Sequence, residues 1–196
     1  MRRPTAALVT AFAALVAAPS LVACSSAAGS PEPTATATPA ATAVPDLVLT
    51  SPDLAADGTL PAWASGRYSS VCQGENRSPT LSWEGGPDEV ASYVLTLTDP
   101  AHPQYVHWVV TGIPGGTRGL DQAEEGAIDV GVVGSSYRGG GMYAGPCVPG
   151  NTYVYTLYAL DTEVVGDAAT SLDAALALTE GHVLDEATLE VVPSPG

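Results

Sequence analysis

Asp99 and His107 are the side chains of this 196-residue sequence whose types and spacing best fit a binding site. Residues 92–98 alternate as a β-strand does, so Asp99 continues a face on which apolar side chains point. Pro100 cannot donate a hydrogen bond to a neighbouring strand, so pairing should stop there, and a second strand-like run follows at residues 107–111. An acid that ends one strand and an imidazole that begins the next predict the mouth of a small polar pocket.

Short strand-like runs also make up most of the remaining chain. We expect strands at residues 47–50, 81–83, 92–98, 107–111, 153–160 and 188–192. The run 153–160 is apolar on both faces, which predicts the best-buried strand. The turn residues at 84–88 predict a hairpin between two strands, and the glycine-rich segment 117–141 predicts a long loop.

One segment has the signals of a helix. Residues 170–178 combine Thr170 or Ser171 as an N-cap with Asp173 in the first turn, and Gly181 marks the end. His182, just beyond, is expected to pack at the helix end. Many short strands with one or two helices predict an all-β fold, a sandwich with small helical additions.

The first 23 residues have the order of a bacterial lipoprotein signal peptide. Arg2 and Arg3 precede an apolar run, and Leu21-Val22-Ala23-Cys24 has the form at which lipoproteins are cut and lipidated. An ordinary secretory signal is the alternative, whereas a membrane-spanning helix would need about 20 apolar residues. We therefore expect a lipid on Cys24 and a protein held on the outer face of a bacterial cell membrane.

The segment 24–45 is nearly all Ser, Ala, Thr, Pro and Gly, which predicts a disordered linker. Residues 46–196 then form one domain. The chain contains 21 acidic residues against six arginines and no lysine, a net charge of −15. Such a surface repels nucleic acid, so we expect no nucleic-acid partner, and membrane attachment should depend on the lipid rather than on charge.

Cys72 and Cys147 are the two cysteines that remain after Cys24. In an exported protein a disulfide between them is favoured over free thiols. A catalytic thiol and a metal ligand are the alternatives, and neither has supporting spacing in the sequence. We expect no metal and no cofactor.

Seven short motifs occur in an order that resembles the phosphatidylethanolamine-binding protein family, and in particular its bacterial Raf-kinase-inhibitor-like branch. They are Gly-Glu-Asn-x-Ser-Pro at 74–79, Leu-Ser-Trp at 81–83, Asp-Pro at 99–100, His-Trp-Val-Val at 107–110, Gly-Pro-Cys at 145–147, Tyr-Thr-Leu-Tyr-Ala-Leu-Asp at 155–161 and Gly-His-Val-Leu at 181–184. The resemblance covers nearly the whole domain and implies a sandwich of two antiparallel β-sheets with one or two short peripheral helices.

The resemblance also implies one small anion-accepting pocket. Its expected residues here are Asp99, Pro100, His107, Tyr143, Gly145 and Pro146. Family ligands are phosphate-like headgroups and small anions, and members have been described as modulators of kinases and inhibitors of serine proteases. The chain departs from the family pattern at Ala101, where the family has a second Asp, and at Asn151, where it has a His.

Three classes of function follow from these observations. The favoured one is a non-enzymatic, membrane-tethered binding protein, in which a protonated His107 pairs with an anion and the Gly145 loop supplies backbone donors. In this hypothesis Asp99 either orients the imidazole or accepts a hydrogen bond from an ammonium group. The alternative is an inhibitor or scaffold that contacts a protein partner through its loops. A hydrolase with His107 as base is disfavoured because the sequence has no Gly-x-Ser-x-Gly nucleophile motif.

Overall fold

The computed structural model describes residues 44–68, 70 and 72–194. The predicted signal peptide, the predicted lipidation site Cys24 and nearly all of the predicted linker lie outside these residues. Within the described residues no helix has the length and apolar character needed to cross a membrane.

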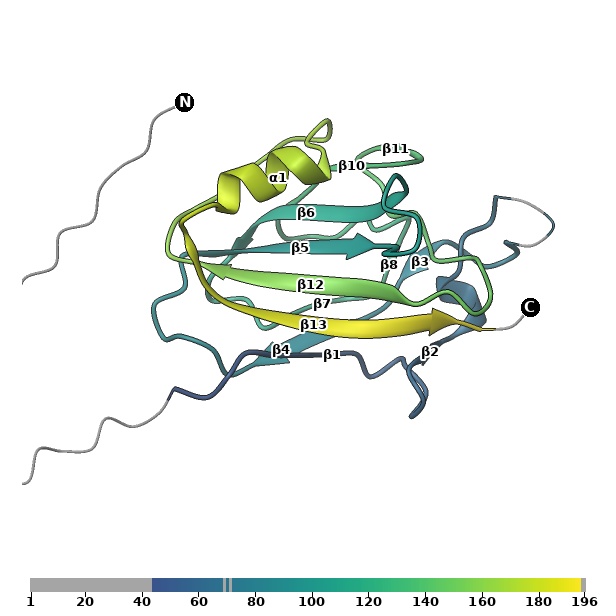
Figure 1. The fold of residues 1–196 in the computed structure, drawn as a ribbon, viewed down its shortest axis with the longest axis horizontal. Coiled ribbons are helices and arrows are strands. Elements are labelled where there is room, and N and C mark those ends of the chain that lie inside the picture. Colours follow the sequence, from purple (N-terminus) through teal and green to yellow (C-terminus); the bar gives the residue numbers. More distant parts are fainter. Residues whose placement is uncertain (1–43, 69, 71, 195–196) are drawn as a thin grey trace, which may run out of the picture. The chain divides into compact units, whose positions relative to one another are not determined.

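A six-stranded sheet is the largest element (Figure 1). Its strands, in spatial order, are β2 (Thr59–Leu60), β13 (Val183–Pro193), β12 (Tyr153–Leu160), β5 (Ser92–Thr98), β6 (Val106–Pro114) and β9 (Val132–Val133). Neighbouring strands pair antiparallel, except that the short edge strand β2 runs parallel to β13. The pairing of β5 with β6 is the one that matters for the site, because Asp99 directly follows β5 and His107 is the second residue of β6.

A three-stranded antiparallel sheet packs against the first and closes the sandwich. It contains β1 (Val48–Thr50), β4 (Leu81–Glu84) and β7 (Gly119–Leu120). In β4, Leu81 and Trp83 are buried while the residues between and after them are exposed, as expected for a strand with one face on a core. The Trp83 ring meets the Tyr93 ring of β5 edge to face at 5.4 Å, so the two sheets share one hydrophobic core.

Several shorter elements lie outside the two main sheets. They are the 3₁₀ turn η1 (Ala62–Ala64), the paired strands β3 (Arg77–Ser78) and β8 (Ala123–Glu124), the hairpin β10 (Ser135–Ser136) and β11 (Gly139–Gly140), and the helix α1 (Leu172–Thr179). The α1 N-cap is Ser171, whose hydroxyl accepts a hydrogen bond from the Ala174 amide at 3.2 Å. The helix, its Ser171 cap and Asp173 in its first turn were predicted from the sequence.

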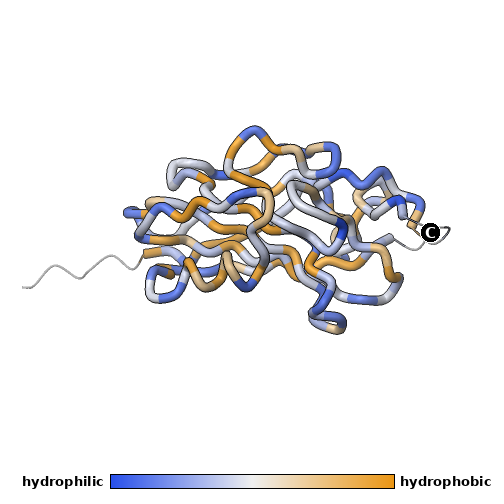
Figure 2. The backbone as a smooth tube through the Cα atoms, turned by 90° about the horizontal axis from the view of Figure 1, so that it is seen from above, coloured by the Kyte–Doolittle hydropathy of each residue, from blue (hydrophilic) through white to orange (hydrophobic). Residues whose placement is uncertain are grey.

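Burial follows the layers. Strand β5 is buried on both faces, because the three-stranded sheet covers one and Leu160 and Val164 pack against Val94 on the other. Figure 2 shows hydrophobic stretches running through the middle of the domain and hydrophilic residues at many of its turns. The all-β sandwich with one short helix confirms the predicted fold class.

Four local predictions were wrong. The turn at 84–88 does not make a hairpin, because Gly85 and Gly86, both at positive φ, carry the chain from β4 in one sheet to β5 in the other. The segment 117–141 contains five short strands rather than one loop. Strand β12 is half-exposed at alternate positions and is less buried than β5. His182 is exposed and contacts the Asp161 carboxylate at 2.8 Å instead of packing on the helix.

Candidate functional site

A cavity of about 350 Å³ opens at the end of the β5–β6 pair. It is lined by Asp99, His102, Tyr105, His107, Tyr137 and Tyr153, together with Val148, Pro149 and both cysteines of the disulfide. The predicted acid and imidazole therefore share one concavity. Thr98 and Val106 are the last residue pair before the bend, and Asp99 follows that pair into the bend. His107 is the extra residue of β6 at the register shift between the Leu97–Trp108 and Thr98–Val106 pairs.

The bend between the two strands is built from two successive turns. The His102 amide donates to the Asp99 carbonyl at 3.0 Å, and the Tyr105 amide donates to the His102 carbonyl at 2.9 Å. These turns hold His102 and Tyr105 at the rim of the cavity, where both are exposed.

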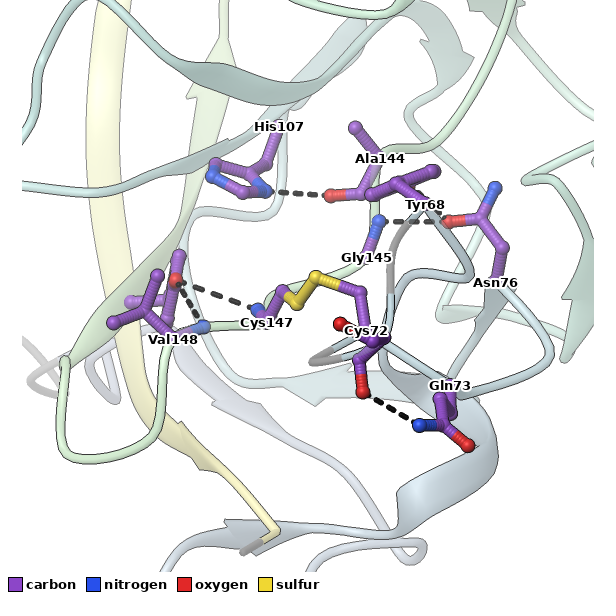
Figure 3. The surroundings of a disulfide bond; sticks show 11 residues. Tyr68, Cys72, Gln73, Asn76, His107, Ala144, Gly145, Cys147 and Val148 are labelled. Atoms are coloured by element: carbon purple, nitrogen blue, oxygen red, sulfur yellow. Dashed lines mark hydrogen bonds between the residues drawn. A yellow bond between two sulfur atoms is a disulfide. The ribbon is translucent and has the colours of Figure 1, made fainter. Parts of the chain in front are cut away.

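His107 is held by a backbone carbonyl. Its Nδ1 lies 2.5 Å from the Ala144 carbonyl oxygen (Figure 3). A carbonyl can only accept, so Nδ1 carries the proton and, in the neutral ring, Nε2 is an acceptor. Burial lowers the pKa of His107 below its usual value, although the Ala144 carbonyl and the negative charge of Asp99 act in the opposite direction. Near neutral pH the cavity therefore contains a neutral imidazole.

Asp99 is buried and fully engaged within the protein. One carboxylate oxygen accepts from the amides of Ala101 and His102, and the other accepts from Asn151 Nδ2 at 3.0 Å and lies 3.1 Å from His102 Nδ1. Burial alone would raise its pKa, but these hydrogen bonds outweigh burial and lower it. Asp99 thus fixes the bend and His102. The prediction that it orients His107 was wrong, because Ala144 does so.

The Gly145–Pro146 corner lies behind the cavity and does not line it. The Gly145 amide donates to Asn76 Oδ1 at 2.8 Å, so it is not free for a ligand, contrary to the prediction. Asn76 also donates to the Tyr143 carbonyl at 3.0 Å. A Cβ at position 145 would lie 2.5 Å from the Ala64 carbonyl oxygen, which explains a glycine here. The corner positions the chain around His107 rather than touching a ligand.

Two further predicted residues also lie away from the cavity. Tyr143 is fully buried, and its hydroxyl donates to the Ala64 carbonyl at 3.2 Å. Pro100 is exposed on the bend and does not line the cavity. Both support the site indirectly.

The predicted pairing of Cys72 with Cys147 is confirmed. The two residues form a disulfide with their Cα atoms 5.4 Å apart. Both cysteines line the cavity, so the bridge is part of its wall (Figure 3).

Tyr153 and Tyr137 are cavity residues that the sequence analysis missed. The Tyr153 hydroxyl accepts hydrogen bonds from the Cys147 and Val148 amides at 3.4 and 3.1 Å, which leaves its own proton for a ligand. Its ring lies 4.9 Å from that of His107. The start of the 153–160 strand, next to the Cys147 loop, could have indicated Tyr153. Tyr137 lies in an irregular segment without such a signal.

The permanent charge of the cavity is the carboxylate of Asp99, whose hydrogen bonds are satisfied by its own neighbours. Among the described residues that line the cavity there is no arginine. Across the described part of the chain no three His, Cys, Asp or Glu side chains converge in a way that could hold a metal ion. The site can offer a hydroxyl donor, a histidine nitrogen and aromatic faces.

The family model described as phosphatidylethanolamine-binding protein matches residues 50–193, most of the chain and all of the sandwich except the first two residues of β1. The chain belongs to the phosphatidylethanolamine-binding protein family. A UPF0098 protein of Methanothermobacter thermautotrophicus is 42% identical over 127 residues, which cover 61% of this chain and 83% of that protein. LppC of Mycobacterium tuberculosis, which carries the name of a lipoprotein, is 33% identical over 141 residues, 68% of this chain and 66% of its own.

Solved structures of the same family have the same fold. The phosphatidylethanolamine-binding protein homologue CT736 of Chlamydia trachomatis superposes with a TM-score of 0.66 at 26% identity, covering 77% of this chain and 99% of its own. YbcL of E. coli gives 0.67 at 23% identity, covering 76% and 98%. The resemblance predicted from short motifs is thereby confirmed.

The structure shows the contacts of Asn151 and Ala101, the two residues that the sequence analysis identified as departures from the family pattern. Asn151, at the position of a family histidine, donates to Asp99 and so adds no charge to the rim. Ala101, at the position of a family aspartate, is exposed and contributes only its amide to Asp99. Among the described residues that line the cavity of this member of the phosphatidylethanolamine-binding protein family, only the side chains of His102 and His107 can carry a positive charge, and His102 faces Asp99.

Proposed function

We propose that this protein is a membrane-tethered, non-enzymatic binding protein whose cavity takes a small anion or a phosphorylated headgroup. The observation that carries the proposal is the fixed imidazole of His107, with Nδ1 on Ala144 and Nε2 left for a ligand in a cavity of about 350 Å³. Tyr153 adds a hydroxyl donor beside it.

Anion binding at this site requires a proton. Neutral His107 offers only a lone pair at Nε2, so it can accept a hydrogen bond from the O–H group of a monohydrogen phosphate, or take up a proton and pair with the anion. Both routes couple binding to acidification. A neutral or hydroxyl-bearing ligand would show no such coupling.

The tether is part of the same proposal. The lipoprotein-like sequence up to Cys24 and the name of the relative LppC support a lipid anchor on the outer face of the membrane. The linker 24–45 would then separate the domain from the membrane surface.

The proposal is tested by titrating phosphoethanolamine into the domain and into its His107→Asn variant by calorimetry. Asparagine places an amide nitrogen near the position of Nδ1, so it keeps a donor for Ala144 and removes Nε2. We expect binding to the unchanged domain at millimolar or lower concentration and at least a tenfold loss in the variant. Equal affinity in both, or no heat with the unchanged domain, would refute the proposed site.

A second candidate is an inhibitor or scaffold that binds a protein through the rim of the cavity. Tyr105 and Val148, 47% and 49% exposed, are large apolar side chains on that rim and favour this candidate. Binding to a kinase or serine protease that survives Asp99→Ala with His107→Ala, but is lost in Tyr105→Ser with Val148→Ser, would support it over the first.

A further inference from the structure

Arg138 differs from the other arginines of the described chain in its partners. The other three are engaged with protein oxygens: Arg67 with Glu125 at 3.2 Å, Arg77 with Glu124 at 3.3 Å, and Arg118 with the Gly115 and Thr117 carbonyls, each at 2.8 Å. Within residues 44–68, 70 and 72–194, the Arg138 guanidinium has neither an acidic partner nor a carbonyl partner. It is a free cation on a strongly acidic protein.

The structure holds this guanidinium on an aromatic platform. Arg138 and Tyr137 form the turn between β10 and β11, and the Ser136 hydroxyl fixes that turn by accepting the Arg138 amide at 3.2 Å. The guanidinium carbon lies 4.3 Å from the centre of the Tyr68 ring and 6.0 Å from that of Tyr137. Both distances are in the range of cation–π attraction.

One of the two rings of this platform, that of Tyr137, is part of the cavity wall. The Tyr137 ring lines the cavity and meets the His107 ring edge to face at 5.2 Å. The Tyr68 hydroxyl donates to Asn76 Oδ1, the same oxygen that accepts from Gly145. Arg138 is exposed, directly follows Tyr137 in sequence and is thus one aromatic ring away from His107.

An anion that approaches this protein meets an acidic surface and, beside the cavity, the carboxylate of Asp99. A guanidinium without an acidic partner at the mouth offsets that repulsion and can hold two phosphate oxygens at once. We propose that Arg138 is a second anion-pairing group of this site, and that the ligand is a phosphate ester whose negative charge lies at the mouth, between Arg138 and His107. This inference rests on the proposed function and adds Arg138 as the residue that favours negatively charged ligands over neutral ones.

The test compares three variants by calorimetry with phosphoethanolamine at low salt. Arg138→Gln should weaken binding about three- to fivefold, the range expected for a solvent-accessible ion pair. Arg138→Lys should recover most of the affinity, because it keeps the charge. The matched control is Arg67→Gln, an exposed arginine that is already paired with Glu125 and should bind as the unchanged domain does.

The salt dependence of the affinity distinguishes ion pairing by Arg138 from a purely structural role, which would not change it. Raising the salt concentration from 20 to 200 mM should weaken binding to the unchanged domain more than to Arg138→Gln, because screening acts on the pair that the variant lacks. Equal affinity of Arg138→Gln and the unchanged domain would overturn the inference. If His107→Asn still lost affinity in that case, the proposed function would stand. An equal loss in Arg67→Gln would also overturn it, and no binding to the unchanged domain would overturn both.

Discussion

The ring of His107 is fixed in one tautomer by the Ala144 carbonyl, which lies 2.5 Å from Nδ1. The Ala144 amide also donates to the His107 carbonyl at 2.8 Å, so the two contacts join strand β6 to the chain just before the Gly145–Pro146 corner. The contact to Nδ1 decides which nitrogen the ring can offer a ligand. The ring is neutral near pH 7 and has its other nitrogen left for a ligand, so this ring gains a positive charge only when Nε2 is protonated.

Stability should fall on mild acidification because of His107. Its pKa is lower in the folded than in the unfolded chain, mainly through burial, so the unfolded chain binds more protons once the pH drops through 6.5. The contribution of His107 to the free energy of unfolding is fully present above pH 6.5. It is lost as the pH falls from 6.5 toward the pKa of His107 in the folded protein. Urea unfolding at pH 7.5 and 5.5 measures this, and His107→Asn should show a smaller loss. An equal loss in both proteins would contradict the assignment to His107.

Replacing Asp99 by Asn should destabilise the bend by about 1 to 3 kcal/mol. The buried carboxylate accepts from Asn151 and from the His102 ring, and an amide group cannot accept all of these bonds. The pKa of His107 should also fall further, because the charge of Asp99 raises it. The matched control is Asp161→Asn, a half-exposed carboxylate that contacts His182 and should change the stability by less than about 1 kcal/mol. Similar losses in both variants would argue against a special role for Asp99.

The Cys72–Cys147 disulfide should contribute about 4 kcal/mol to stability through the entropy of the unfolded chain, since it links residues 75 apart in sequence. Denaturant unfolding of the double Cys→Ser variant measures this contribution. Because both cysteines line the cavity, the variant should also bind phosphoethanolamine more weakly. Loss of stability with unchanged affinity would show that the bridge is only structural.

Adding one methyl group at Gly145 should destabilise the protein by about 1 to 3 kcal/mol, because the new Cβ would lie 2.5 Å from both the Ala64 oxygen and the Gly66 nitrogen. The backbone would have to move, and Ala144 with it. Gly116→Ala is the control, since nothing lies within 4 Å of its added Cβ. Thermal melts of both variants check this, and a neutral Gly145→Ala would refute the close-packed corner.

Local sequence patterns predicted the parts of the fold that local physics controls. The Ser171 cap and the alternation of residues 92–98 each depend on neighbours in sequence. The hairpin at 84–88 failed because Gly85 and Gly86 permit a crossover between sheets as readily as a hairpin turn, and only the packing of Trp83 against Tyr93 decides. The burial of β5 likewise comes from α1 and Val164, which lie far along the chain.

The site was predictable to a similar degree. The proline bend predicted that Asp99 and His107 lie at one cavity. It did not predict which hydrogen bonds their side-chain atoms make. Which partner holds the imidazole depends on Ala144, 37 residues away, and the Gly145 amide is occupied by Asn76, 69 residues away. Tyr137 and Arg138 reach the site through a hairpin whose short strands have no periodic signal.

The most direct measurement is the pKa of His107, followed by NMR of its ring nitrogens with and without sulfate, an anion whose charge does not change between pH 5 and 8. The unliganded protein should titrate below 6.5 with the proton on Nδ1 in the neutral form, and sulfate should raise that pKa and bind more tightly as the pH falls. A neutral form protonated at Nε2, or a pKa that saturating sulfate leaves unmoved, would contradict the account.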